Sequence, residues 1–137
     1  MPAKDKFFDA VLKALEADGW TITDEEFYLP FAARTAYIDI LAEKPVTAEK
    51  AGRKIAVEVK TFGSAARMSE LEKAVGQFVI YKTALAIAGL EHDLYLAVPN
   101  DMSEFFQLPD VAKLRRDFGI KVVCYDPQQE VISQWID

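Results

Sequence analysis

Two neighbouring strand patterns constrain the fold of this chain most. Apolar residues concentrate in Thr35–Ala42 and again in Lys54–Phe62, and the segment between them, Glu43–Arg53, contains Pro45 and Gly52. Proline and glycine in a short polar segment indicate a loop, so we predict that the two strands pair as a hairpin. Alternate residues of the second strand are apolar, which predicts one buried face and an opposite face that carries its polar residues.

Helical and strand patterns alternate on either side of this hairpin. Helices are predicted over Ala3–Asp18, Ser69–Ala88 and Pro109–Phe118, and further strands over Trp20–Thr23, Asp93–Val98, Ile120–Tyr125 and Glu130–Trp135. Glycine follows each helix, as is usual at helix C-termini, and Ser69 with Glu72 forms a capping box. The segment Asp24–Arg34 contains Pro30 and is interpreted as a loop. The order α-β-β-β-α-β, then α-β-β, predicts an α/β fold with a mixed central sheet and flanking helices.

Length and composition exclude several classes of protein. The chain has 137 residues, of which 28% are charged, and we interpret residues 1–137 as one globular domain. No apolar run approaches the roughly 18 residues of a membrane span, and charges occupy the N-terminal region where a signal peptide is apolar. We therefore expect a cytoplasmic protein with no membrane contact. Cys124 and His92 are single, which excludes an intramolecular disulfide and a metal site built from cysteine or histidine.

Acidic and basic side chains gather on the polar faces of the predicted hairpin. Pairing of the strands places Asp39 across from Glu58 or diagonal to it. Two carboxylates at that separation repel unless a cation lies between them, and hard oxygen ligands suit Mg²⁺ or Mn²⁺. Lys60 projects from the same face as Glu58, where it would orient or deprotonate a water, or neutralise charge on a phosphate. The alternative is an ordinary solvated strand face, because a Glu-x-Lys sequence is common.

This constellation resembles the PD-(D/E)XK nuclease superfamily, in which Asp39, Glu58 and Lys60 match the metal ligands and the lysine. The resemblance implies a restriction-endonuclease-like αβββαβ core and divalent-metal-dependent cleavage of DNA phosphodiesters. It departs from the superfamily pattern at Ile38, where a proline often precedes the first acid. In that superfamily an acidic residue of the first helix often joins the metal cluster, and Glu16 is the match. The alternative for Glu16 is a solvated glutamate on the flank of the helix.

Some members of the superfamily also carry Gln-x-x-x-Tyr on the helix after the lysine strand. Gln77 and Tyr81 reproduce that motif, and their spacing places both on one helix face. The resemblance implies that Gln77 belongs to the catalytic site, and that Tyr81 is a weaker candidate for nucleic-acid contact. Packing of the ring in the core with a solvated hydroxyl is the alternative for Tyr81.

A longer set of segments resembles the XisH family, the cyanobacterial fdxN element excision controlling factors. These segments are Leu15–Thr23, Tyr37–Asp39, Lys54–Lys60, Gly76–Phe78, Leu94–Pro99 and Val122–Trp135. The resemblance implies a role in the programmed excision of a DNA element, together with a recombinase and a companion called XisI. Family membership indicates a process, whereas the acidic cluster indicates a chemistry. The alternative function is a non-catalytic accessory protein that keeps the nuclease-like fold and binds DNA or a partner protein.

Nucleic-acid contact and self-association are further expectations. A net charge of −6 argues against binding of DNA through the overall charge of the chain, although a local basic patch is compatible with that net charge. Lys50, Arg53 and Lys54, near the hairpin loop, are the candidates for contact with a DNA backbone. A nuclease that cuts both strands of a duplex needs two active sites, which a homodimer supplies. The cluster of Phe105, Phe106 and Leu108 either fills the core or forms an exposed patch.

Overall fold

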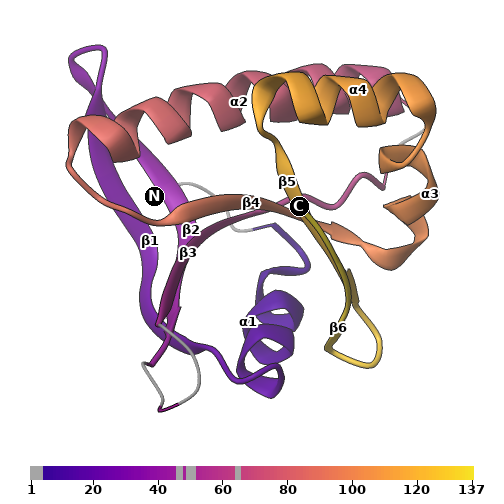
Figure 1. The fold of residues 1–137 in the computed structure, drawn as a ribbon, viewed down its shortest axis with the longest axis horizontal. Coiled ribbons are helices and arrows are strands. Elements are labelled where there is room, and N and C mark those ends of the chain that lie inside the picture. Colours follow the sequence, from indigo (N-terminus) through magenta and orange to yellow (C-terminus); the bar gives the residue numbers. More distant parts are fainter. Residues whose placement is uncertain (1–4, 46–47, 49–51, 64–65) are drawn as a thin grey trace.

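A six-stranded mixed sheet with helices on both faces forms the fold (Figure 1). A computed structural model describes residues 5–45, 48, 52–63 and 66–137. The helices are α1 (Phe8–Ala17), α2 (Arg67–Ile87), α3 (Ser103–Phe106) and α4 (Pro109–Phe118), with a 3₁₀ turn at Asn100–Met102. The strands are β1 (Thr21–Phe31), β2 (Arg34–Lys44), β3 (Arg53–Val59), β4 (Asp93–Pro99), β5 (Lys121–Asp126) and β6 (Val131–Ile136). This architecture confirms the predicted α/β fold class, with a mixed sheet flanked by helices.

The strands follow one another across the sheet in chain order, from β1 to β6. Strands β1, β2 and β3 are antiparallel, β3, β4 and β5 are parallel, and β6 returns antiparallel to β5. Parallel neighbours need a crossover, which α2 supplies between β3 and β4, and α4 between β4 and β5. Figure 1 shows α2 and α4 on one face of the sheet and α1 on the other. Each face therefore has its own hydrophobic core.

The prediction of a loop over Asp24–Arg34 is wrong, because these residues complete a long hairpin of β1 and β2. The turn consists of Ala32 and Ala33, both in the left-handed region with φ of 52° and 59°. Two-residue hairpin turns of this kind usually contain asparagine or glycine, so two alanines give no turn signal. Pro30 also argued against a strand, but β1 is an edge strand and a missing N–H is tolerated there.

Several other boundaries differ from those expected. The capping box at Ser69 does not start α2, because Ala66 occupies the N-cap position and the helix already begins at Arg67. Strand β3 ends at Val59 instead of Phe62, whose φ of 50° turns the chain away from the sheet. Helix α4 has the predicted bounds, and Gly119 follows it in the left-handed conformation. None of the described helices is long and apolar enough to cross a membrane.

The aromatic cluster near α3 is divided between the core and the surface. Phe106 is completely buried and its ring meets that of Phe62 edge to face, with the centroids 5.5 Å apart. Phe105 packs against the same core while remaining half-buried. Leu108, two residues after Phe106, is 47% exposed. The cluster therefore mainly fills the core, where it holds Phe62, three residues after the end of the strand that carries Glu58.

Candidate active site

Two buried carboxylates face each other across the pairing of β2 with β3. Because Ile40 is paired with Val57, the next residues along the ladder, Asp39 and Glu58, lie opposite each other. Asp39 is 7% exposed and Glu58 6%. The Asp39 N–H donates to Glu58 Oε1 at 3.4 Å, and the Val59 N–H donates to Asp39 Oδ2 at 2.8 Å. The hairpin thus brings these two predicted residues into direct contact.

Lys60 extends beside this pair and is held by side-chain and backbone contacts. Its Nζ lies 3.7 Å from Glu58 Oε2 and donates a hydrogen bond to Gln77 Oε1 from α2. The Lys60 N–H donates to the Ala97 carbonyl at 2.8 Å, and the Tyr125 hydroxyl donates to the Lys60 carbonyl at 3.2 Å. The side chain remains 20% exposed. The ammonium group is therefore fixed next to the carboxylates while keeping access to solvent.

A cavity of about 270 Å³ opens onto these side chains. Its lining combines acids, tyrosines and one amide around Lys60: Asp5, Tyr37, Asp39, Glu58, Val59, Lys60, Gln77 and Tyr81. Gln77 and Tyr81 come from adjacent turns of α2, as their i, i+4 spacing requires. The structure therefore places the two residues of the Gln-x-x-x-Tyr motif at the same cavity as Asp39, Glu58 and Lys60.

Burial raises the pKa of both carboxyl groups. For Asp39, burial outweighs the hydrogen bonds from Glu58 and Val59, which lower its pKa. For Glu58, burial and then the charge of Asp39 raise the pKa to about 9, while Lys60 opposes this rise. Two carboxylates in contact in a desolvated site do not both ionise without a compensating charge. At neutral pH the metal-free pair therefore holds a proton.

The tyrosines of the cavity also keep their protons. Burial, followed by the charge of Glu58, raises the pKa of Tyr81 to about 12. Burial and the charge of Asp39 raise the pKa of Tyr37. Both hydroxyls are consequently neutral hydrogen-bond donors at physiological pH. They add polar contacts to the cavity without adding charge.

The N-terminal acid at this cavity is Asp5, whereas the residue expected there was Glu16. Glu16 lies exposed on α1 and does not line the cavity. Asp5 precedes α1, and its Oδ1 accepts a hydrogen bond from the Phe7 N–H at 3.0 Å and another from the Thr61 hydroxyl. Its charge contributes to the raised pKa of Asp39. In a helical projection Asp5 and Glu16 lie on the same side of the predicted first helix, so periodicity alone could not favour Asp5 over Glu16.

The acidic pair provides a limited but suitable donor set for a divalent cation. Within the described part of the chain, no group of three or more His, Cys, Asp or Glu side chains is arranged to hold a metal ion. The expected set of Asp39, Glu58 and Glu16 is therefore not assembled. Mg²⁺ commonly binds through only one or two carboxylates and keeps several waters as ligands. The proton-sharing pair of Asp39 and Glu58 fits that mode of binding, because a cation would supply the missing positive charge.

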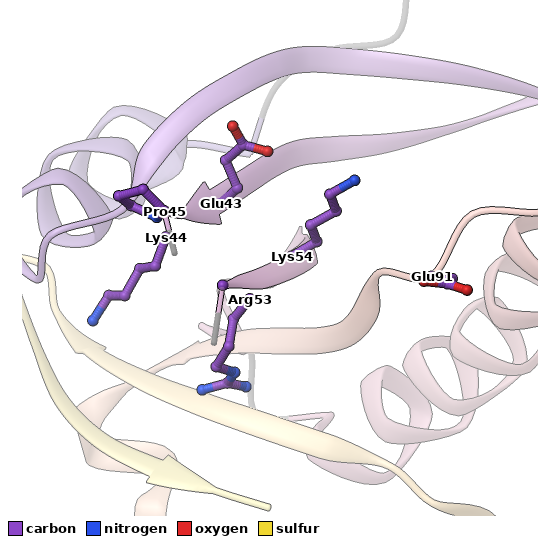
Figure 2. A pocket seen from close by; sticks show the side chains of 7 residues that line it. Glu43, Lys44, Pro45, Arg53, Lys54 and Glu91 are labelled. Carbon is purple, nitrogen blue, oxygen red and sulfur yellow. The ribbon is translucent and has the colours of Figure 1, made fainter. Parts of the chain in front are cut away.

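The candidates for DNA-backbone contact lie at the other end of the hairpin. Arg53 and Lys54 line a separate cavity of about 390 Å³, where Figure 2 shows their charged ends pointing in different directions. The Arg53 guanidinium donates to the Tyr95 hydroxyl at 3.1 Å and lies 5.5 Å from the Trp20 ring. Five residues of extended strand, roughly 16 Å, separate Arg53 from Glu58. Lys50 falls outside the described residues.

Fold and cavity together define an α/β protein whose central hairpin carries a buried carboxylate pair beside a lysine. The family described as "XisH protein" matches residues 1–133, and the chain belongs to this family. An XisH family protein from Nostoc punctiforme PCC 73102 is 39% identical, with a TM-score of 0.84 over 97% of this chain and 100% of that one. An fdxN element excision controlling factor protein from Anabaena variabilis is 38% identical, with a TM-score of 0.85 over 98% of this chain and 100% of that one. No curated protein matches the chain.

Proposed function

We propose that this protein is an excision-controlling factor with a nuclease-like site that acts on DNA phosphodiesters in the presence of Mg²⁺ or Mn²⁺. The observation that carries the proposal is the buried contact between Asp39 and Glu58 beside Lys60. Burying two carboxyl groups in contact costs stability, and a structural scaffold has no need of that cost. Together with the α-β-β-β-α-β order of the first elements, it supports membership of the PD-(D/E)XK superfamily.

Each side chain of the cavity has a defined role in this proposal. Asp39 and Glu58 would hold the cation, whose chemistry is to polarise a phosphodiester and to lower the pKa of a bound water. Lys60 places a positive charge where negative charge develops on the phosphate oxygens. Gln77 fixes the direction of the Lys60 ammonium group by accepting its hydrogen bond. Asp5 ties the segment before α1 to Thr61, immediately after Lys60.

The biological context of the proposal comes from the relatives. The Anabaena variabilis protein is described as controlling excision of the fdxN element, and at 38% identity we extend that role to this chain. DNA is then the target, an XisI-like protein is the companion, and a homodimer would supply two sites for the two strands of a duplex. Co-purification with an XisI-like protein and sedimentation at micromolar concentration test these two associations separately.

A non-catalytic accessory role is the second candidate. The Lys60 ammonium group already contacts Glu58 and Gln77, and the acidic pair lacks a third carboxylate ligand among the described residues. The net charge of −6 also slows unsteered association with a polyanion. These observations favour a protein that keeps the nuclease-like fold and acts through partners.

Metal titration separates the two functions. Calorimetry should detect Mn²⁺ binding to the unmodified protein and to Glu16→Gln, whose exposed side chain does not line the cavity, and no binding to Glu58→Gln. A parallel assay should detect cleavage of linear or branched duplex DNA by the first two proteins only. Absence of Mn²⁺ binding at millimolar concentration would contradict the nuclease-like proposal. Binding without cleavage of any substrate would favour the accessory role.

A further inference from the structure

A pair of tyrosines on the β1–β2 hairpin lies beside the cavity that holds the carboxylate pair, and one of the two lines it. Tyr28 of β1 and Tyr37 of β2 are directly opposite in the hairpin, and their ring centroids are 6.1 Å apart at an interplanar angle of 49°. Tyr37 lines the cavity together with Asp39, two residues further along the same strand. Tyr28 is 48% exposed, so much of its surface is accessible to a ligand. An accessible aromatic surface thus continues from the outside of the hairpin into the cavity.

The charges of the cavity are poorly suited to gripping a phosphate backbone. Among the described residues that line it, Lys60 is the single cation, and it already contacts Glu58 and Gln77. Three acids line the same space, namely Asp5, Asp39 and Glu58. The chain as a whole carries a net charge of −6. Affinity for a nucleic acid at this cavity must therefore come mainly from contacts other than those with phosphate.

We infer that the cavity takes an unpaired nucleotide, whose base stacks on the aromatic surface of Tyr28 and Tyr37. The faces of paired bases are covered by their neighbours in a duplex, so only a flipped, frayed or single-stranded base presents a free face to a tyrosine. Stacking also tolerates the acidic surroundings, because the neutral π-face contributes the attraction. The inference rests on the proposed function only in that the cavity handles nucleic acid.

Fluorescence anisotropy with three labelled probes tests this inference: a short oligothymidylate, an abasic strand of the same length, and a hairpin duplex. The abasic strand has the same phosphates without bases. The proteins are the unmodified chain, Tyr28→Ala, Tyr28→Phe and Phe118→Ala, the last removing an exposed ring from α4. Stacking on an aromatic side chain is worth about 5- to 150-fold in affinity per base. We expect Tyr28→Ala to weaken oligothymidylate binding within this range, and Tyr28→Phe and Phe118→Ala to bind as the unmodified chain does.

The outcomes separate this inference from the proposed metal chemistry. Equal affinity for the oligothymidylate and the abasic strand would overturn stacking, and so would tighter binding of the duplex than of the oligothymidylate. A loss of oligothymidylate affinity in Phe118→Ala equal to that in Tyr28→Ala would also overturn it. Absence of binding to every probe would also overturn it, whatever the calorimetry of Mn²⁺ shows. Base-dependent binding that is lost in Tyr28→Ala would support the inference even if Mn²⁺ does not bind. In that case the proposal of a metal-dependent reaction would be contradicted, while the inference of a nucleotide-binding site would be supported.

Discussion

Replacing Glu58 with glutamine is expected to stabilise the metal-free protein at alkaline pH. The pKa of Glu58 is raised to about 9 in the folded protein, against an ordinary value of 4.5, so folding takes up a proton between these two values. Because folding raises the pKa of the Glu58 carboxyl group, its full contribution to the stability of the folded protein is present below pH 4.5 and is lost as the pH rises toward 9. The stability of the unmodified protein should therefore fall across this window, whereas glutamine cannot titrate there.

The size of the effect follows from the same values. Each pH unit above the ordinary value costs about 1.4 kcal/mol, so at pH 8 the cost reaches a ceiling of about 5 kcal/mol. Loss of the contact between the Lys60 ammonium group and Glu58 Oε2, 3.7 Å apart, offsets about 1–3 kcal/mol of the gain. We expect a net increase of about 3 kcal/mol in the free energy of unfolding at pH 8, or roughly 10 °C in Tm.

Thermal unfolding of Glu58→Gln in EDTA at pH 4.5 and pH 8 measures this increase. The matched control is Glu16→Gln, because Glu16 is exposed on α1 and should change Tm little at either pH. A stabilisation of the same size at both pH values, or a loss of stability at pH 8, would refute the argument from proton uptake. Mg²⁺ should then raise the Tm of the unmodified protein and leave that of Glu58→Gln unchanged.

Three further substitutions, two of them with a matched control, test the fold by urea unfolding. Ala33→Gly should raise the free energy of unfolding by about 0.5 kcal/mol, because relief of the left-handed backbone of Ala33 outweighs the added entropy of the unfolded chain. As a control, the same change at exposed Ala86 of α2 should lower the free energy of unfolding by about 1 kcal/mol. A loss of stability in Ala33→Gly would contradict the turn geometry. Phe106→Ala should cost about 3–5 kcal/mol and Leu108→Ala within about 0.5 kcal/mol, and equal effects would contradict their different burial. Tyr125→Phe should lose about 0.5–1.5 kcal/mol with its hydrogen bond, and an unchanged midpoint would argue against that bond.

The elements whose signals are local could be predicted from the amino-acid sequence. The alternating residues of the segment Lys54–Phe62 identified the strand that carries Glu58, although it ends at Val59, before Lys60. Pro109 and Gly119 bounded α4 correctly. The i, i+4 spacing of Gln77 and Tyr81 likewise placed them on one face of α2. These predictions succeed because periodicity and helix termini depend on residues within a few positions of each other.

Features that depend on distant parts of the chain could not be predicted and emerge from the packing of the folded protein. Ala32 and Ala33 form a hairpin turn without a turn signal because the pairing of β1 with β2 holds them in the left-handed region. Asp5 rather than Glu16 reaches the cavity because the position of α1 on the sheet fixes which end of the helix lies beside Thr61. The pKa of Glu58 rises because folding removes its water and places Asp39 against it. Burial and contact between segments are collective properties of the packed chain, which no local pattern specifies.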